Sequence, residues 1–121
     1  MSGRTFTAGS LHLGLDADER RRHADDILRL LAGRDQPWVV AGDFNEKADA
    51  PAWRTLAAGH EDVGAEHDQP TFPASAPRRR IDTVLIPRGW KVSVVSPSDI
   101  VGETDLIAAT DHRPVVVDVV G

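Results

Sequence analysis

The sequence contains no cysteine among its 121 residues. This excludes a disulfide scaffold, a thiolate zinc site and a cysteine nucleophile. Long hydrophobic runs are also absent, because stretches such as Trp38 to Ala41 and Val115 to Val117 are far too short to span a membrane. The first ten residues contain no apolar core of a signal peptide. We therefore expect a soluble, cytoplasmic chain without a membrane span.

Positive charge is scarce, with 14 Lys and Arg against 19 Asp and Glu and a formal net charge of -5. Binding to bare nucleic-acid backbone needs clustered cations, so this balance argues against it unless a bound divalent metal changes the local sign. The sequence also lacks the G-x-S-x-G, Walker, G-x-G-x-x-G and H-E-x-x-H patterns. Serine hydrolase, nucleotide triphosphatase, dinucleotide-binding and zinc peptidase functions therefore have no supporting motif.

The remaining composition, 40% hydrophobic and 27% charged, is that of an ordinary globular protein. The length predicts a single domain over residues 1–121. A chain of this size can bury roughly two thirds of its unfolded surface, which is enough for a modest core.

The first half of the chain predicts a strand followed by a helix and a second strand. Residues Thr5 to His12 alternate as a strand does, and Asp16 with Glu19 three residues later forms a capping box. The helix expected from Ala17 to Leu31 carries an apolar stripe and ends at Gly33. Residues Trp38 to Ala41 form a continuous apolar run, which is typical of a strand buried on both faces.

The second half of the chain predicts mainly strands. A short helix begins at Pro51 and ends before Gly59, and the polar segment from Gly59 to Arg80 is interpreted as a long functional or mobile loop. Three further strands are predicted at Ile81 to Ile86, Lys91 to Val95 and Pro114 to Val120.

The strongest local motif is Gly42-Asp43-Phe44-Asn45, at the end of the buried strand. It delivers a carboxylate and a carboxamide two positions apart, and such hard oxygen donors favour Mg²⁺ or Mn²⁺. An Asx-type turn, in which Asp43 and Asn45 serve the backbone only, explains the same pattern equally well.

Other polar residues near predicted strand ends can also carry chemistry. Asp111 and His112 precede the last strand and combine a carboxylate with an imidazole. Asp82 follows Arg78, Arg79 and Arg80, whose planar guanidinium groups match phosphate oxygens. His12 ends the first strand, and each of these groups taken alone is more often structural than catalytic. The other histidines, which lack supporting context, are assigned to surface or loop: His23, His60 and His67.

The order of the motifs is more specific than any one of them. The series S-L-H-L-G-L-D, G-D-F-N, T-F-P with R-R-R-I-D, and T-D-H-R-P-V-V-V-D-V resembles the endonuclease/exonuclease/phosphatase family from about Thr5 to Val120. The resemblance implies an α/β fold, a two-layer β-sandwich flanked by helices. It also implies Mg²⁺-dependent (or Mn²⁺-dependent) hydrolysis of phosphodiester or phosphomonoester bonds, as in nucleases and phosphodiesterases, with nucleic acids, phospholipids or small molecules as substrates.

The resemblance further implies a role for each matching residue. Asp43 would position or deprotonate the attacking water, and His112 would contact the scissile phosphate, with Asp82 orienting its imidazole. His12 would contact phosphate. The remaining expectations are a metal or phosphate ligand at Asn45, a metal ligand at Asp111, metal binding by Asp43 itself, and substrate binding by Arg80.

The matching motifs belong to the later, C-terminal half of the family's domain. The opening strand that ends in an Asn and the strand that ends in the principal metal-binding Glu have no counterpart before Thr5. We therefore expect exposed strand edges, covered by a second copy in a homo-oligomer or by a partner that supplies the other half.

Two other functions remain open at this stage. The chain can be a non-catalytic half-domain that acts by self-association or partner binding, or an enzyme that reuses the site for non-phosphate acid-base chemistry. Loss of the metal carboxylate favours the former, whereas retention of the polar site residues favours catalysis.

Overall fold

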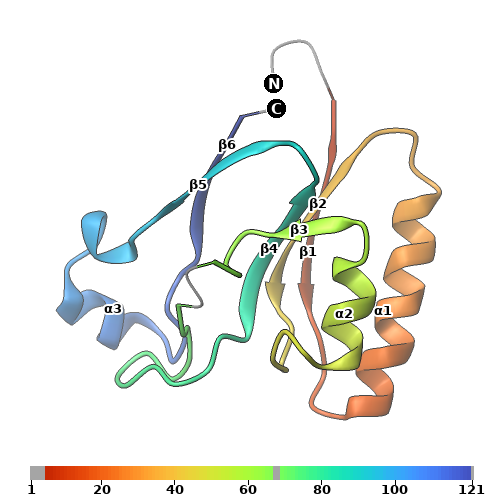
Figure 1. Ribbon diagram of the computed structural model, residues 1–121. Coiled ribbons are helices and arrows are strands. Elements are labelled where there is room, and N and C mark those ends of the chain that lie inside the picture. The colour runs from red at the N-terminus through yellow and green to blue at the C-terminus, as the bar shows by residue number, and fades with distance from the viewer. Residues whose placement is uncertain (1–4, 67–68, 121) are drawn as a thin grey trace.

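A four-stranded mixed sheet forms the middle layer of the molecule (Figure 1). The computed structural model describes residues 5–66 and 69–120. The strand order is β1-β2-β4-β3, in which β1 and β2 are parallel and β4 is antiparallel to both of its neighbours. The strands span Thr7–His12 (β1), Trp38–Asp43 (β2), His60–Asp62 (β3) and Asp82–Pro87 (β4).

Helices and a second sheet cover the two faces of this middle layer. The helices α1 (Ala17–Ala32) and α2 (Pro51–Ala57) lie on one face, and the antiparallel pair β5 (Lys91–Val95) and β6 (Val116–Val120) lies against the other (Figure 1). A short 3-10 helix, η1 (Pro97–Asp99), and the helix α3 (Glu103–Ala109) connect β5 to β6. The predicted α/β sandwich with flanking helices is confirmed.

The helix α1 begins and ends close to the predicted positions. The Glu19 backbone N–H donates a 3.0 Å hydrogen bond to Asp16 Oδ1, so the predicted cap is present. Ala24 and Leu31 are buried against the sheet. The helix ends at Gly33, whose N–H returns to helix carbonyls.

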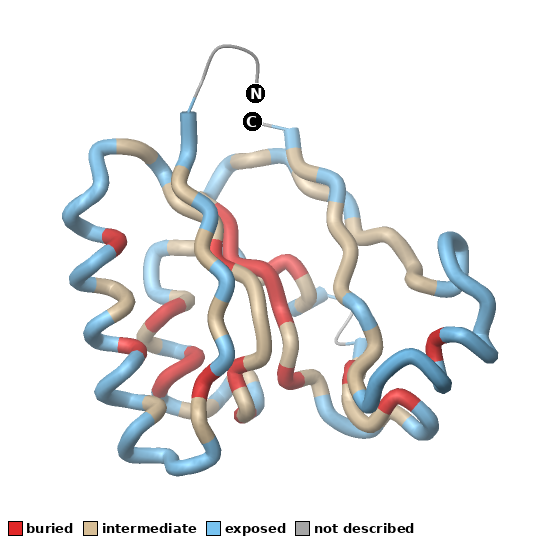
Figure 2. The backbone as a smooth tube through the Cα atoms, turned by 180° about the vertical axis from the view of Figure 1, so that it is seen from behind, coloured by how far each residue is buried: buried red, intermediate tan, exposed pale blue. Residues whose placement is uncertain are grey.

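The strand β2 is buried from both sides, as its continuous apolar run predicts. Val40 packs with Phe44 and Trp53 on the helical side, whereas Val39 and Ala41 pack toward the second sheet. Figure 2 shows the buried residues concentrated in the central strands and on the inward-facing turns of the helices. Each large apolar side chain buried there contributes about 1.5–3 kcal/mol to the free energy of unfolding.

The segment from Gly59 to Arg80 is not a loop throughout, which corrects the prediction. It contains β3, and Phe72 forms an isolated bridge with Arg79. His60 lies on β3, where its ring stacks on Trp38 at a centroid distance of 3.4 Å and its Nε2 donates to the Trp38 carbonyl at 3.2 Å. His60 is therefore half-buried by its contact with Trp38 rather than free on the surface or in a loop. His23 is exposed, as predicted, and His67 lies outside the described residues.

The segment between β5 and β6 holds η1 and α3, neither of which the sequence pattern indicates. α3 buries a single residue, Leu106, so its apolar stripe is too short to show a helical period. The last strand begins at Val116 rather than at Pro114, because a proline has no N–H to donate to a sheet.

Within the described residues, four strands have one unpaired edge. β1 and β3 are the outer strands of the four-stranded sheet, and β5 and β6 pair only with each other. None of the described helices has the length and apolar character needed to cross a bilayer.

Candidate active site

Strand register brings three predicted site residues into one row. His12 ends β1 opposite Asp43 at the end of β2, and Asp43 in turn lies opposite Asp82, the first residue of β4. Because β4 runs antiparallel to β2, its beginning meets the ends of β1 and β2 at one edge of the sheet. This is the lower edge in Figure 1.

Gly42 allows β1 and β2 to approach each other beside this row. Its φ is +150°, and a Cβ built there would lie 1.9 Å from the Leu11 carbonyl oxygen. Since that oxygen belongs to the backbone of β1, a side chain at position 42 would push the two strands apart. The glycine before Asp43 is thus required by backbone packing.

The Asp43 side chain combines a structural contact with an outward-facing oxygen. Its Oδ1 accepts the Asn45 backbone N–H at 2.8 Å, so the Asx-type turn is present. Asn45 has a positive φ of 52°, a conformation that Asn tolerates, and its side-chain NH₂ donates to the Leu13 carbonyl. The other oxygen, Asp43 Oδ2, lies 3.4 Å from His12 Nε2 and 3.6 Å from His112 Nε2. The Gly42-Asp43-Phe44-Asn45 motif therefore forms a backbone turn and also presents a carboxylate oxygen to the two histidines.

His112 is held by Asp82. Its Nδ1 donates to Asp82 Oδ2 at 2.8 Å, so its Nε2 is the ring nitrogen that faces Asp43. The ring also packs on Phe72, with centroids 4.9 Å apart. Asp82 Oδ2 accepts a second hydrogen bond of 2.6 Å from the Thr71 hydroxyl.

The exposure of the site falls from its rim inward. The side chains of Asp43, Asp82 and His112 are 16%, 17% and 24% exposed, whereas those of His12 and Asp111 are 74% and 75% exposed. An open cleft joins them, lined by these residues together with Asn45, Phe72 and the turn at Leu13–Leu15. The inner three are held by hydrogen bonds, and the outer two are open to solvent.

Two opposing effects act on the pKa of His112. Burial lowers this pKa, but the hydrogen bond to Asp82 and the negative charges of Asp82, Asp43 and Asp111 together raise it above the ordinary value of 6.5. The site therefore favours the imidazolium, which can stabilise an anion.

The donor atoms suit a magnesium ion held by few protein ligands. One ligand atom from each of Asp43, Asp82 and His112 falls within 4.8 Å of the others. Asp82 Oδ2 already accepts two hydrogen bonds, whereas Asp43 Oδ2 and the Asn45 amide oxygen are hard donors available to a metal, with the exposed Asp111 at the rim. Mg²⁺ is commonly bound by one or two carboxylates plus water and substrate phosphate.

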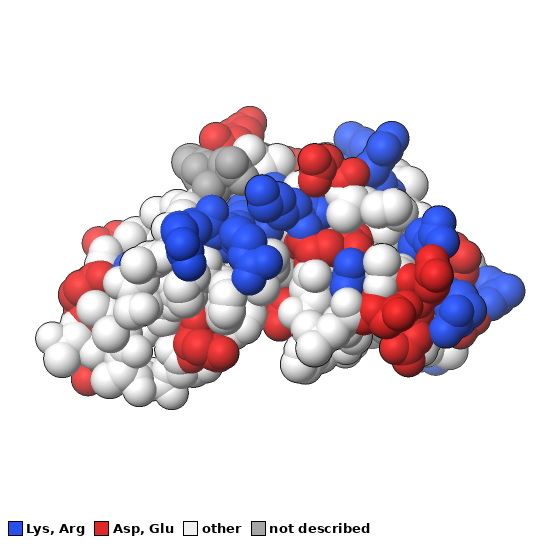
Figure 3. Space-filling model, turned by 90° about the horizontal axis from the view of Figure 1, so that it is seen from below, with Lys and Arg blue, Asp and Glu red and all other residues white. Residues whose placement is uncertain are grey.

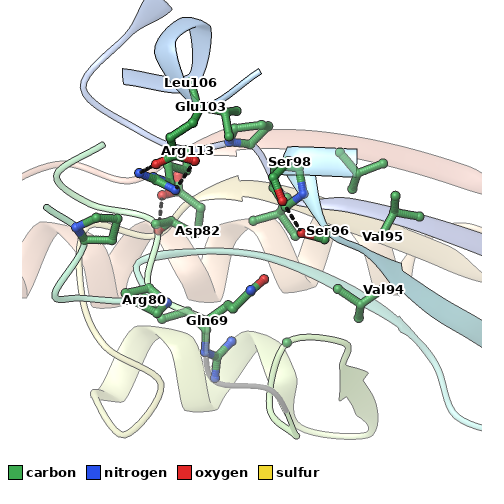
Figure 4. A pocket seen from close by; sticks show the side chains of 18 residues that line it. Gln69, Arg80, Asp82, Val94, Val95, Ser96, Ser98, Glu103, Leu106 and Arg113 are labelled. Atoms are coloured by element: carbon green, nitrogen blue, oxygen red, sulfur yellow. Dashed lines mark hydrogen bonds and ion pairs between the residues drawn. The ribbon is translucent and has the colours of Figure 1, made fainter. Parts of the chain in front are cut away.

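Two predicted residues lie apart from the inner site. Asp111 Oδ1 is 3.9 Å from His112 Nε2 but points to the rim. Arg80 does not line the cleft. Its Nη1 donates to Asp62 at 3.0 Å, and its guanidinium lies 4.9 Å from the centre of the Trp53 ring. Arg80 instead lines a second pocket, which Asp82 also borders (Figure 4).

Sequence reasoning assigned no role to Thr71 or Glu46, which support the site. Thr71 binds Asp82, and the only signal for it is its place in the T-F-P motif. Glu46 directly follows the G-D-F-N motif but is not free for a metal. It accepts a 2.7 Å hydrogen bond from the Trp53 N–H and pairs with Arg20 at 2.8 Å.

The face that carries the strand ends has mixed charge. Figure 3 views the molecule from that side and shows Lys and Arg side chains gathered together with acidic side chains beside them. The described residues that line the cleft include Asp43, Asp82 and Asp111 but no Lys or Arg, so an anionic ligand meets positive charge there at the protonated His112.

Solved structures share this fold. A functionally unknown conserved protein from Enterococcus faecalis aligns with a TM-score of 0.74 and 23% identity, over 93% of this chain and 48% of that one. A mannosyl-6-phosphatase from Bacteroides thetaiotaomicron gives 0.63 and 17%, over 93% and 50%. The catalytic domain of human Nocturnin, with bound sulfate, gives 0.67 and 16%, over 98% and 48%.

These identities establish a common fold, and the chain spans about half the length of each of the three structures. No curated protein matches the sequence. The model of the Endonuclease/Exonuclease/phosphatase family matches residues 4–112, which is most of the chain. With the sandwich and the row of site residues in place, we conclude that this chain belongs to the endonuclease/exonuclease/phosphatase family.

Proposed function

We propose that the cleft hydrolyses phosphate esters in a metal-dependent reaction, with phosphodiesters as the favoured substrates. The observation that carries this proposal is the Asp82–His112 pair, bonded at 2.8 Å, whose free imidazole nitrogen faces the Asp43 carboxylate. The mannosyl-6-phosphatase among the similar folds supports a phosphate-ester substrate.

In the proposed reaction, Asp43 acts on the attacking water, whereas His112 and His12 act on the phosphate. Asp43 Oδ2 orients the attacking water and accepts its proton, as a carboxylate that is mostly shielded from solvent can do. His112, protonated and fixed by Asp82, places Nε2–H against a phosphate oxygen and stabilises the charge that develops there. His12 adds a contact to the phosphate from the rim.

A divalent cation would be held by Asp43, Asn45 and Asp111, and when bound it would neutralise charge on the nonbridging phosphate oxygens. The protein side chains would still have to bind, orient and exchange protons with the substrate. Asn45 is suited to this position because its NH₂ is anchored to the backbone and its amide oxygen is therefore fixed.

The test is hydrolysis of bis(para-nitrophenyl) phosphate with Mg²⁺ or Mn²⁺ by the wild-type chain and two variants. We expect Asp43→Ala and His112→Ala each to lower kcat at least roughly a hundredfold, since each removes a group used in the transition state. The matched controls are Asp25→Ala and His23→Ala, which change the same residue types on the exposed face of α1. Wild-type turnover in Asp43→Ala or His112→Ala would contradict the proposal.

The unpaired edges favour a second candidate, in which the chain acts by association. β1, β3, β5 and β6 each have one free edge in the described part of the chain, and similar folds are about twice as long. We propose that a second copy or a partner chain covers these edges. Sedimentation should show association that increases with concentration, and a monomer at every concentration would remove self-association from consideration.

A further inference from the structure

Thr71 is a buried polar residue with a direct contact to the candidate catalytic pair. Its side chain belongs to a residue only 4% exposed, and it lies in the loop before β4. The hydroxyl donates to Asp82 Oδ2 at 2.6 Å and accepts the Ile81 backbone N–H at 3.3 Å.

These two contacts fix the direction of the hydroxyl. A hydroxyl has one proton to donate, and the Ile81 N–H can only donate. The Thr71 proton must therefore point to Asp82. The same carboxylate oxygen accepts His112 Nδ1–H at 2.8 Å, so two donors hold it from different segments of the chain.

The backbone around Thr71 ties the same loop to the segment that carries His112. The Thr71 carbonyl accepts the Arg113 N–H at 2.7 Å, and the Ala74 N–H donates to the Asp111 carbonyl at 2.7 Å. These hydrogen bonds flank His112 on both sides. The loop thus contacts Asp82 through a side chain and the His112 segment through its backbone.

We propose that Thr71 is a positioning residue, which fixes the Asp82 carboxylate and thereby sets the orientation of the His112 ring and, when that ring is neutral, its tautomer. Its effect on catalysis rests on the phosphoesterase function proposed above, whereas its effect on the imidazole does not. Serine can replace it, because serine keeps the hydroxyl. Valine cannot, because it keeps the shape but leaves Asp82 with one donor fewer.

The first test measures the imidazole tautomer by ¹⁵N–¹H NMR at a pH where His112 is neutral. In the wild type and in Thr71→Ser we expect the proton on Nδ1, because Asp82 accepts it there. In Thr71→Val we expect a mixture of Nδ1–H and Nε2–H forms. The matched control is Thr83→Val, since Thr83 is also buried, follows Asp82 on β4 and donates to a different carboxylate, Asp62.

The outcomes of this test are separate from turnover. A wild-type tautomer in Thr71→Val, or the same change in Thr83→Val, overturns the positioning role even if the chain hydrolyses phosphate esters. If Thr71→Val does not fold, the proposal is tested on the wild-type chain instead. We expect the Thr71 hydroxyl proton to exchange slowly with water, and a rapidly exchanging proton overturns the proposal.

The second test measures kinetics on bis(para-nitrophenyl) phosphate. Thr71→Val should lower kcat by roughly tenfold or more with little change in KM, the range typical of residues that orient a catalytic group. In an Asp82→Asn background the same substitution should have almost no further effect, because Thr71 acts through Asp82. Additive losses contradict the proposal. Absence of turnover in the wild type contradicts the phosphoesterase function and leaves the tautomer result standing.

Discussion

Three carboxylates surround the His112 ring, and they set the pH range over which it is charged. Burial lowers the pKa of His112, but the hydrogen bond and charge of Asp82, with the charges of Asp43 and Asp111, raise it above 6.5 overall. A pKa raised by folding stabilises the folded state below pH 6.5, and this contribution is lost as pH rises through the folded-state value.

Removing the Asp82 charge should therefore lower the pKa of His112. We expect Asp82→Asn to shift the NMR titration of the His112 ring to lower pH, because the hydrogen-bonded carboxylate is the main group that favours the imidazolium. Asp25→Asn, on the exposed face of α1, should leave the titration unchanged. An unaltered midpoint in Asp82→Asn would be inconsistent with the pairing seen here.

His60 should respond to pH in the opposite sense. Burial lowers the pKa of His60 below 6.5, and the nearby Arg88 adds to this, although the hydrogen bond to Trp38 acts against it. The unfolded chain then binds more protons than the folded chain, so stability falls as pH drops through 6.5. Urea unfolding of the wild type and His60→Gln should show this loss in the wild type and a smaller one in the variant.

The sequence predicts the chemical groups of the site better than their supports. Asp43, Asp82 and His112 stand beside strands, where motif and position agree, and the structure brings them together. Thr71 could not be assigned from its own position, because a hydroxyl in a long loop has no periodic or spacing signal. The burial of Arg80 against Asp62 and Trp53 depends on contacts far along the chain, which no local pattern encodes.

At the scale of secondary structure, Glu46 replaces a missing cap on α2. Ala50 at the N-cap has no side chain that can cap, and Glu46 accepts the Trp53 N–H in its place while pairing with Arg20. We expect Glu46→Ala to lower the free energy of unfolding by about 2 kcal/mol, because it leaves a helix N–H without its acceptor and the Nε of the largely buried Arg20 without its carboxylate. Urea unfolding measures this, with Glu61→Ala on the exposed side of β3 as control. Equal losses in the two variants would refute it.

The junction between β1 and β2 should tolerate no side chain at position 42. We expect Gly42→Ala to lower the free energy of unfolding by at least about 2 kcal/mol, since its Cβ collides with backbone and its φ is unfavourable. The matched control is Gly102→Ala, where a Cβ meets nothing within 4 Å. A Gly42→Ala chain as stable as the control would mean that the strands separate at little cost.

Elements with a pattern of their own along the chain are predictable from this sequence, and elements that depend on distant contacts are not. The α1 stripe shows a helical period and β2 shows a continuous apolar run, and both elements are present, as are the shorter α2 and β5. β3 has only three residues, and it forms because β4 offers an edge and Trp38 offers a stacking partner. Such an element depends on tertiary contacts rather than on local preference.

At the scale of the whole molecule, a metal titration tests whether this chain alone forms a site that holds a metal ion. We expect calorimetric titration with Mg²⁺ or Mn²⁺ to show binding to the wild-type chain that is abolished in Asp43→Ala, because Asp43 Oδ2 is the central hard donor. Binding that persists in Asp43→Ala would place the metal elsewhere. Asp25→Ala, with its substitution on α1, controls for loss of surface charge.

The arrangement of layers is predicted here through the family resemblance, whereas the apolar run of β2 indicates by itself only that this strand is covered on both faces. The sequence does not predict the pairing of β5 with β6, or the contact of these strands with Val84 and Ile86, because those depend on the whole sandwich.

The row formed by His12, Asp43 and Asp82 has a consequence for how this protein can fail. These residues meet only if the backbone ladders of β1, β2 and β4 are in their observed register. A slip of one position would turn Asp43 toward the opposite face of the sheet, while many of the strand hydrogen bonds could form again. A misaligned chain would thus keep much of its secondary structure and lose the site, so the proposed activity would report the fidelity of strand pairing more sensitively than circular dichroism does.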